Sequence, residues 1–296
     1  MHKLAGAWPT MVTPFDENLK IDLGAYRAMI AWYLAHRAGG LYAVCLSSEM
    51  FQLTSAERLL LTREAVISAG GRLPVASTGN LGDTLTDHIE SCRQVADAGA
   101  DVVMLVVPEF LHTDADLEGY YLTLAEKVNA PLGLYECPVP RPFHLSVNLV
   151  RKLAHSGRFV AYKETSCDLE KIRAHLAATA GTPLALLQAN TPYMLEAVRA
   201  GSPGSMTIAA IWLPDLVAEV IEKAQAGDPA ADCMHARLCA LKLAQRSVHP
   251  LGSKYLLSKR GVPLAAIGRG SPKTLRPETL LALDYAFREW EQFLAN

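Results

Sequence analysis

Short apolar segments alternate with longer amphipathic segments along the first three quarters of the chain. The apolar segments have the length of strands and are mostly preceded by Gly, Ala-Gly or Pro; they lie at residues 6–10, 41–45, 73–77, 102–107, 131–135, 160–163, 184–188 and 204–207. Apolar strands that alternate with helices are typical of a parallel sheet whose two faces are covered. The pattern therefore predicts an α/β protein.

The segments between these strands carry helix start signals. Thr54-Ser55-Ala56-Glu57 has the form of a capping box, in which a hydroxyl and a carboxylate bind free backbone N–H groups. Residues 84–87 form a looser version of the same pattern. The helices that follow the next three strands are expected to begin at Asp114, Ser146 and Asp168, because short polar side chains favour the N-cap position.

Eight strands with a helix after each give the count of a closed (β/α)8 TIM barrel. The alternative is an open doubly wound sheet, which usually has a Gly-rich turn after its first strand. Residues 8–14 contain no glycine. We therefore favour the barrel.

The strand pattern stops near residue 225, and three helical stretches follow at about 229–247, 252–260 and 276–294. We expect residues 1–225 to form the catalytic barrel and residues 226–296 a C-terminal helical extension packed on it. Between Met234 and Arg276 there are nine Lys and Arg residues and no acid. This stretch is either a solvated basic face or a surface that binds an anion or another subunit.

Composition excludes several classes of protein. Of 296 residues, 50% are hydrophobic, which excludes a disordered chain, and 28 Lys and Arg against 30 Asp and Glu argue against a nucleic-acid-binding protein. Six cysteines without a C-x-x-C pair do not make a disulfide scaffold. The start of the chain is a poor signal peptide, and apolar runs are too short to span a membrane. We expect a cytoplasmic protein that does not bind membranes.

Catalytic residues of such a barrel lie at the C-terminal ends of its strands. Lys163 ends an apolar strand there, and partial desolvation lowers the pKa of a lysine. A neutral amine can attack a carbonyl and form an imine, which then serves as an electron sink for breaking or forming a neighbouring C–C bond. The alternative is a lysine paired with Glu164 or Glu136.

Two neighbouring strand ends support the catalytic interpretation. Tyr135 ends the preceding strand, and its phenol can move protons near an imine. Ser47 and Ser48 at the end of the second strand offer hydroxyls and N–H groups suited to a carboxylate. Together these strand ends indicate a keto acid that is held by its carboxylate and attacked at its carbonyl.

With these residues in place, the sequence resembles the dihydrodipicolinate synthase/N-acetylneuraminate lyase family of pyruvate-dependent class I aldolases. The resemblance runs in order over nearly the whole chain. It rests on residues 9–15, the Ser48-Glu49 end of the Gly-x-x-Gly-Glu loop, Tyr135-x-x-Pro138, Lys163-Glu164-Thr165-Ser166 and Gly201-x-x-Gly204-Ser205.

The resemblance implies a role for each matching position. Lys163 is the Schiff-base lysine and Tyr135 the proton-relay phenol. Leu46 and Ser47 take the places that bind the pyruvate carboxylate. The expected substrate-binding set also includes Ser48, Thr165, Ala189, Met206, Phe110 and Arg141. The implied assembly is a homotetramer or dimer, and no metal or organic cofactor is needed.

Departures from the family pattern affect the substrate. Synthase members have a hydroxyl residue where this chain has Leu46. Where this chain has Phe110, they have a proton-relay tyrosine that a neighbouring subunit contributes to the site. The arginine expected at Pro140 stands one place later, as Arg141, and Cys45 and Ser48 replace loop glycines.

These departures touch proton relay and recognition of a second substrate, and they leave imine formation intact. We expect a lyase, aldolase or dehydratase for a 2-keto-3-deoxy sugar acid or related 2-oxo acid, with pyruvate as product or donor. The alternatives are 4-hydroxy-tetrahydrodipicolinate synthase activity and a catalytically silent barrel that binds a 2-oxo acid. Glu136 is a candidate additional acid or base, or part of a structural ion pair.

Other enzyme classes fit less well. A metal-dependent hydrolase needs ligands at strand ends, but the nine histidines include no H-x-H or H-E-x-x-H pattern. His112 and His144 are expected to be solvated. Cys45, Cys137 and Cys167 share one expected face, where buried filler is commoner than a zinc site. A nicotinamide or phosphate enzyme would show a Gly-rich signature before a helix, which is missing.

Overall fold

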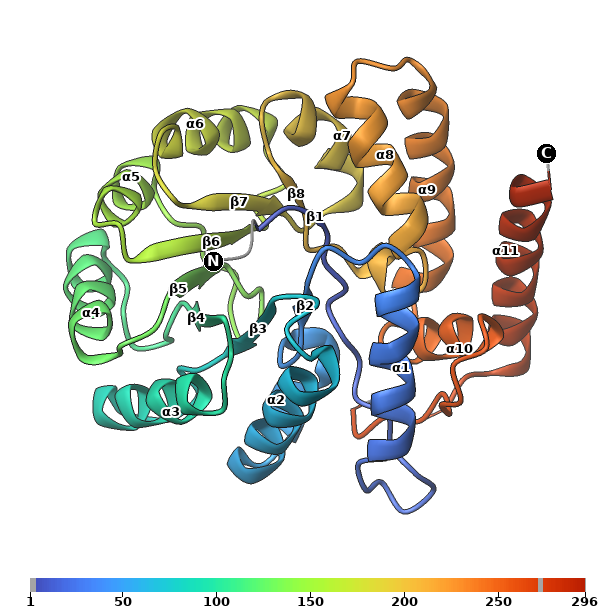
Figure 1. Cartoon of the computed structure of the whole chain (residues 1–296), viewed down its shortest axis with the longest axis horizontal. Coiled ribbons are helices and arrows are strands. Elements are labelled where there is room, and N and C mark those ends of the chain that lie inside the picture. Colours follow the sequence, from blue (N-terminus) through green and yellow to red (C-terminus); the bar gives the residue numbers. More distant parts are fainter. Residues whose placement is uncertain (1–3, 271–273, 296) are drawn as a thin grey trace.

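The computed structural model describes residues 4–270 and 274–295, and it confirms the predicted (β/α)8 barrel (Figure 1). Eight parallel strands follow one another in the order β1-β8-β7-β6-β5-β4-β3-β2. They are β1 (Gly6–Ala7), β2 (Leu41–Tyr42), β3 (Val75–Thr78), β4 (Val102–Val106), β5 (Leu132–Tyr135), β6 (Phe159–Glu164), β7 (Ala185–Gln188) and β8 (Gly204–Ser205). Each strand overlaps a predicted segment.

Contacts between the first two strands close the barrel. Parallel bridges join Ala7 to Ala38 and Thr10 to Tyr42, while β1 pairs with β8 on its other side. At that pairing a Cβ on Gly204 would lie 2.3 Å from the carbonyl oxygen of Gly6, so a side chain there would push the strands apart. The sheet therefore has no free edge between β1 and β2.

A helix follows each strand and covers the outside of the barrel (Figure 1). The eight are α1 (Leu23–Ala35), α2 (Ser55–Ala69), α3 (Leu85–Asp97), α4 (Asp114–Lys127), α5 (Val147–His155), α6 (Leu169–Thr179), α7 (Thr191–Arg199) and α8 (Pro214–Gln225). Three short 3-10 helices, η1 (Leu46–Ser48), η2 (Met50–Gln52) and η3 (Ile208–Ile211), lie in the loops after β2 and β8.

Four of the five predicted helix starts are confirmed. Thr54 and Thr84 each form a capping box, and the side chains of Ser146 and Asp168 accept N–H groups of the first helical turn. The prediction of Asp114 as an N-cap is wrong. Thr113 caps α4, because its hydroxyl accepts the backbone N–H three residues further on, at 3.2 Å, and Asp114 is the first helical residue.

Strand alternation divides the buried side chains into two sets. Tyr135 belongs to the cluster that fills the barrel and continues under α1, α2, α8 and the C-terminal helices. Tyr162, one residue before Lys163, belongs to the outer cluster between β4–β7 and the helices α3–α6. Since successive side chains point to opposite faces, Tyr135 and Lys163 face the interior while Glu136 and Glu164 face outward.

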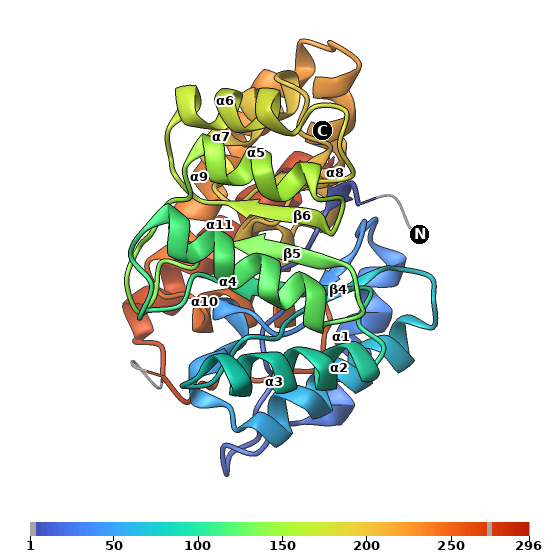
Figure 2. The ribbon, with the colours of Figure 1, turned by 90° about the vertical axis from the view of Figure 1, so that its left-hand side faces the viewer.

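Three further helices follow the barrel at the predicted positions: α9 (Ala230–Arg246), α10 (Leu251–Lys259) and α11 (Pro277–Ala295). Helix α9 packs against α7 and α8, and α11 packs against α9 and α10. Figure 2 shows α10 at the end of the barrel toward which the strands point. No helix within the described ranges is long and apolar enough to cross a membrane.

The interpretation of residues 234–276 as a solvated basic face is wrong for three of its cations. Their side chains are 0%, 7% and 18% exposed and pair with acids outside the stretch: Lys254 with Glu49, Arg260 with Asp215 and Arg269 with Glu57. This part of the C-terminal region is therefore held to the barrel by buried or half-buried ion pairs.

Candidate active site

Lys163 and Tyr135 lie side by side at the C-terminal ends of β6 and β5, where they are register partners. The Lys163 Nζ atom is 4.3 Å from the centroid of the Tyr135 ring and 5.3 Å from that of the Tyr42 ring. The two rings meet edge to face, with their centroids 5.7 Å apart. The amine is thus enclosed between two tyrosines, Tyr135 from the neighbouring strand β5 and Tyr42 from β2, which is not paired with β6.

Neither acid considered as a partner for Lys163 contacts it. Glu164 points outward and accepts hydrogen bonds from Gln188 Nε2 at 2.7 Å and from the Ser166 N–H at 2.8 Å. Within the described residues Lys163 has no ion pair, and its residue is only 5% exposed. Burial lowers the pKa of Lys163, which favours the neutral amine, although the nearby Cys45 and Cys137 thiols act in the opposite direction.

Burial also decides the protonation of the neighbouring phenols. It raises the pKa of Tyr135 and of Tyr42 well above the ordinary tyrosine value, so both rings carry their hydroxyl protons. The Tyr42 hydroxyl is hydrogen-bonded to Thr78 Oγ1 at 2.9 Å. A protonated phenol beside an amine whose pKa is lowered can pass a proton to or from a reacting group.

The loop after β2 holds its two serines differently. The Ser48 hydroxyl donates to the Cys45 carbonyl at 2.6 Å and accepts the Cys45 N–H at 2.7 Å, so it is engaged in η1. The Ser47 hydroxyl donates to Thr10 Oγ1 at 3.1 Å and lies 3.0 Å from His249 Nε2. Ser48 therefore donates its hydroxyl proton to the backbone of its own loop. Ser47 donates its proton to a side chain, Thr10, and could donate it to a bound ligand in place of Thr10.

The other expected pocket residues lie at the ends of β2, β6, β7 and β8. Leu46, Thr165 and Ala189 are partly exposed, and Met206 is 1% exposed. The Thr165 hydroxyl donates to the Glu136 carbonyl at 2.8 Å, which joins the ends of β5 and β6. The role of these residues in binding stays a prediction.

Phe110 and Arg141 lie in neighbouring loops, after β4 and β5. The Arg141 guanidinium donates to the carbonyls of Glu109, at 3.4 Å, and Leu111, at 2.5 Å, and so holds the loop that carries Phe110. The Phe110 ring is 48% exposed and packs against His88. The structure brings Phe110 and Arg141 together, and a contribution of either to substrate binding stays a prediction.

Glu136 is held in the way expected of a structural carboxylate. Its Oε1 atom accepts the Leu145 N–H at 2.8 Å and the Tyr162 hydroxyl at 2.6 Å, and its Oε2 atom accepts the Thr165 N–H at 3.0 Å. Burial raises the pKa of Glu136, but the hydrogen bonds from His144, Tyr162 and the backbone outweigh it, and the net pKa lies below the ordinary value. An ionised, outward-facing acceptor is not a proton donor to the site.

The cysteines and histidines considered as metal ligands do not gather into a metal site among the described residues. Cys45 and Cys137 are buried, while Cys167 is exposed. His144 is bonded to Glu136 at 3.4 Å. Over residues 4–270 and 274–295 the structure contains no group of three His, Cys, Asp or Glu side chains that could hold a metal ion.

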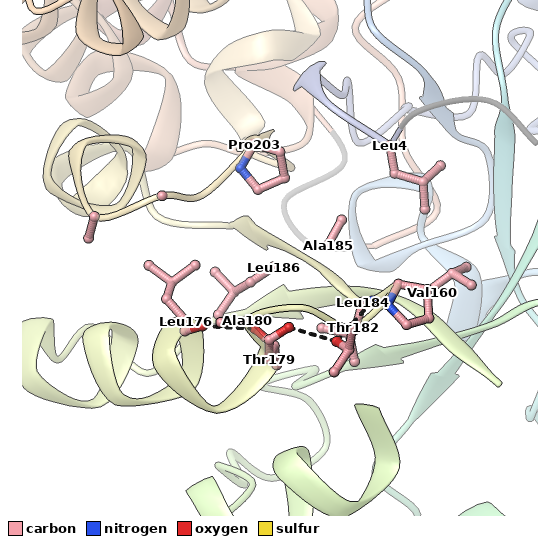
Figure 3. Close-up of a pocket in the computed structure, with 13 residues that line it drawn as sticks. Leu4, Val160, Leu176, Thr179, Ala180, Thr182, Leu184, Ala185, Leu186 and Pro203 are labelled. Carbon is pink, nitrogen blue, oxygen red and sulfur yellow. Dashed lines mark hydrogen bonds between the residues drawn. The ribbon is translucent and has the colours of Figure 1, made fainter. Parts of the chain in front are cut away.

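A cavity of about 490 Å³ opens at the opposite end of the barrel from Lys163. It is lined by residues that precede or begin strands, such as Leu4, Val160 and Leu184, and Figure 3 shows the hydroxyls of Thr179 and Thr182 beside it. Its lining includes no acid, amine, imidazole or thiol. This cavity therefore lacks the groups that a reactive site needs, whatever its size.

Three features of the site were missed in the sequence. Tyr42 faces the lysine because β2 and β6 line the same interior. Glu49 has a φ of 59° and binds Lys254, and His249 reaches Ser47 from a turn 202 residues away. A buried acid could have been suspected from the Glu49 position in the loop motif, but no local signal links it to residue 254.

The sequence profile of the Dihydrodipicolinate synthetase family matches residues 3–279. The chain belongs to this family. The members are lyases of the class I aldolase kind, which bind pyruvate through a Schiff base on a lysine, so the enzyme class expected from the sequence is confirmed.

Individual relatives agree with this assignment. A 4-hydroxy-tetrahydrodipicolinate synthase from Nitrosococcus oceani is 29% identical over 277 residues, covering 92% of this chain and 93% of the relative. The crystal structure of dihydrodipicolinate synthase from Bacillus anthracis superposes with a TM-score of 0.90 at 23% identity, over 97% of this chain and 99% of that one. A prophage protein of the same family from E. coli K12, solved in complex with pyruvate, gives 0.89 at 20% identity, over 97% and 99%.

Proposed function

We propose that this protein is a Schiff-base lyase whose Lys163 amine attacks the carbonyl of a 2-oxo acid. The observation that carries the proposal is the enclosure of the Lys163 Nζ atom between Tyr135 and Tyr42, with no acid paired to it among the described residues. A lysine in this position is uncharged more often than a solvated one, and only the uncharged amine is nucleophilic.

The proposed reaction needs no metal or organic cofactor. The amine adds to the carbonyl, and loss of one water gives the protonated imine of Lys163. Electrons of the C3–C4 bond then flow into the imine as the bond breaks, which releases an aldehyde and leaves an enamine. Tyr135 is the expected proton carrier: its phenol gives a proton to the departing water, the phenolate then accepts the proton of the C4 hydroxyl as the C3–C4 bond breaks, and the phenol so restored can protonate C3 of the enamine. Protonation of the enamine and addition of water release pyruvate.

We propose a 2-keto-3-deoxy sugar acid or a related 2-oxo acid as substrate, cleaved or dehydrated at this imine. Support comes from two apolar side chains: Leu46 in the loop after β2 and Phe110 in the loop after β4 have no proton to pass. The second candidate is 4-hydroxy-tetrahydrodipicolinate synthase activity, which the names of the curated relatives favour. A catalytically silent barrel that binds a 2-oxo acid is the third.

Reduction by borohydride tests imine formation directly. The protein is incubated with pyruvate and sodium borohydride, digested, and analysed by mass spectrometry for a reduced adduct on the Lys163 peptide. We expect the adduct in the wild type and in Lys152→Ala, a control in which an exposed lysine is removed. Lys163→Ala should form none. A folded wild type without an adduct would refute the proposal.

A substrate panel then separates the candidates. Pyruvate release from 2-keto-3-deoxy acids supports the lyase, and condensation of pyruvate with aspartate semialdehyde supports the synthase. An adduct with neither turnover supports the silent barrel. The homotetramer or dimer, the cytoplasmic location and the division of the chain at residue 225 stay predictions.

A further inference from the structure

A hydrogen-bonded chain of side chains links the C-terminal region to the loop after β2. His249 lies in the turn between α9 and α10. Its Nδ1 atom is 2.7 Å from the Ser253 hydroxyl, and its Nε2 atom is 3.0 Å from the Ser47 hydroxyl. The Ser47 hydroxyl in turn donates to Thr10 Oγ1 at 3.1 Å. The imidazole therefore bridges α10 and the expected carboxylate-binding loop.

Trp212 lies at the other end of this hydrogen-bonded network, and its indole N–H determines which group donates in each hydrogen bond between Trp212 and Ser47. The Trp212 indole N–H can only donate, and it donates to Gln245 Oε1 at 3.1 Å. Gln245 Nε2 therefore donates to the Ile208 carbonyl at 2.7 Å and to the Ser253 hydroxyl at 2.6 Å. Among the described residues the Ser253 hydroxyl has no other acceptor for its own proton than His249 Nδ1, so Ser253 donates to Nδ1 and His249 carries its proton on Nε2.

His249 is neutral in this environment. Burial lowers its pKa to about 3, and the positive charges of Lys163 and Lys254 act in the same direction. A neutral imidazole has one donor and one acceptor nitrogen, which agrees with the assignment from Trp212. The only donor of the ring is thus directed at the oxygen of Ser47.

We propose that His249 is a positioning residue that holds the Ser47 hydroxyl as a donor to the carboxylate of the 2-oxo acid. The inference rests on the proposed function. The His249 N–H occupies a lone pair of the Ser47 oxygen, so the Ser47 proton remains for another acceptor. In the free protein that acceptor is Thr10, and a carboxylate is a stronger one. Hydrogen bonds in such a chain also polarise one another, which makes Ser47 a better donor.

A merely structural role for His249 makes a different prediction. The C-terminal region is already tied to the same loop by Lys254, which binds Glu49 at 2.8 Å, and by the backbone N–H groups of Arg269 and Gly270. Loss of His249 should leave these contacts in place. A structural role would change the melting temperature alone, whereas positioning changes the concentration of pyruvate that half-saturates the site.

The experiment measures borohydride trapping of the full-length protein over a range of pyruvate concentrations, with melting temperature as the folding control. We expect His249→Phe to raise the half-saturating concentration by about tenfold to a hundredfold, as for a lost hydrogen bond to a charged group. His249→Gln should stay within about threefold, because its amide N–H can reach the Ser47 oxygen. Ser47→Ala should resemble His249→Phe, and the double variant should be no worse than Ser47→Ala alone.

Each outcome decides the question. Wild-type affinity in His249→Phe while Ser47→Ala is impaired would overturn the inference and leave the proposed function standing. Additive losses in the double variant would overturn it as well. No adduct in the wild type would refute the proposed function itself. If His249→Phe does not fold, Ser253→Ala replaces it, and an unchanged half-saturating concentration in that variant counts against the inference, because nothing then fixes the imidazole proton on Nε2.

Discussion

Replacing Lys254 by methionine tests the buried contact between the C-terminal region and the barrel. The Lys254 side chain is 0% exposed and donates to Glu49 Oε1 at 2.8 Å and to the Ile267 carbonyl at 2.6 Å. Glu49, 5% exposed, also accepts the N–H groups of Arg269 at 2.6 Å and Gly270 at 3.0 Å. Methionine fills nearly the same volume but removes the only full positive charge that faces Glu49 at hydrogen-bond distance among the described residues.

The cost follows from leaving a carboxylate buried without its counter-charge. Such a change destabilises a folded protein by about 3–5 kcal/mol. A chain of 296 residues has an entropy of unfolding of roughly 0.6 kcal/mol/K, at about 2.1 cal/mol/K per residue. Lys254→Met should therefore lower the melting temperature by about 5–8 °C. Lys254→Met combined with Glu49→Gln should regain part of this loss, since no buried charge remains.

Differential scanning calorimetry at neutral pH measures the shift. Lys127→Met is the matched control, because Lys127 is 48% exposed and its partner Glu126 72% exposed, so its loss should cost less than about 0.5 kcal/mol. A Lys254→Met protein that melts within about 1 °C of the wild type would refute the reasoning, since the carboxylate of Glu49 would then not depend on this cation.

Four further outcomes are expected. The rate of borohydride trapping should rise with pH and level off below 10.5, because burial lowers the pKa of Lys163; a rate still rising above that pH contradicts this. Ser48→Ala should lower the free energy of unfolding by about 1–3 kcal/mol through its two lost backbone hydrogen bonds in η1, as measured in urea. Leu46→Thr should raise aspartate semialdehyde condensation at least about tenfold if a missing hydroxyl relay limits it, and an unchanged rate excludes that. Hydrogen bonding to Glu136 raises the pKa of His144 above 6.5, so its stabilisation is complete below that pH and is lost as pH rises through the raised pKa; the difference in melting temperature between wild type and His144→Gln should shrink accordingly.

The sequence was sufficient for the barrel because each of its signals is local. An apolar run, a Gly or Pro boundary and a capping hydroxyl each lie within a few residues, and eight repeats of the pattern leave few alternatives. The one wrong helix start is that of α4, which is capped by Thr113 and not by Asp114. Both residue types favour the N-cap position, and the local sequence does not show which of two adjacent candidates takes it.

Lys163 and Tyr135 were predictable for the same reason. Each is the last inward-facing residue of an apolar strand, and parallel neighbours in a barrel bring such residues together at one end. The resemblance to a known family added roles to positions that alternation had already placed at the mouth. The sequence does not decide whether Glu136, adjacent to Tyr135, is an acid or base of the site or part of a structural ion pair. Its outward side chain follows from the same alternation.

What sequence alone determined about this protein is the order of its elements, the closed parallel sheet and the lysine at its mouth. Tertiary structure decided which groups surround that lysine. The fold places Tyr42 beside Lys163. It also pairs Glu49 with Lys254 and Ser47 with His249, over separations of up to 205 residues. The physical reason is that periodicity and capping act over a few residues, whereas hydrogen bonds between buried polar groups are satisfied by whichever segments the packed core brings together.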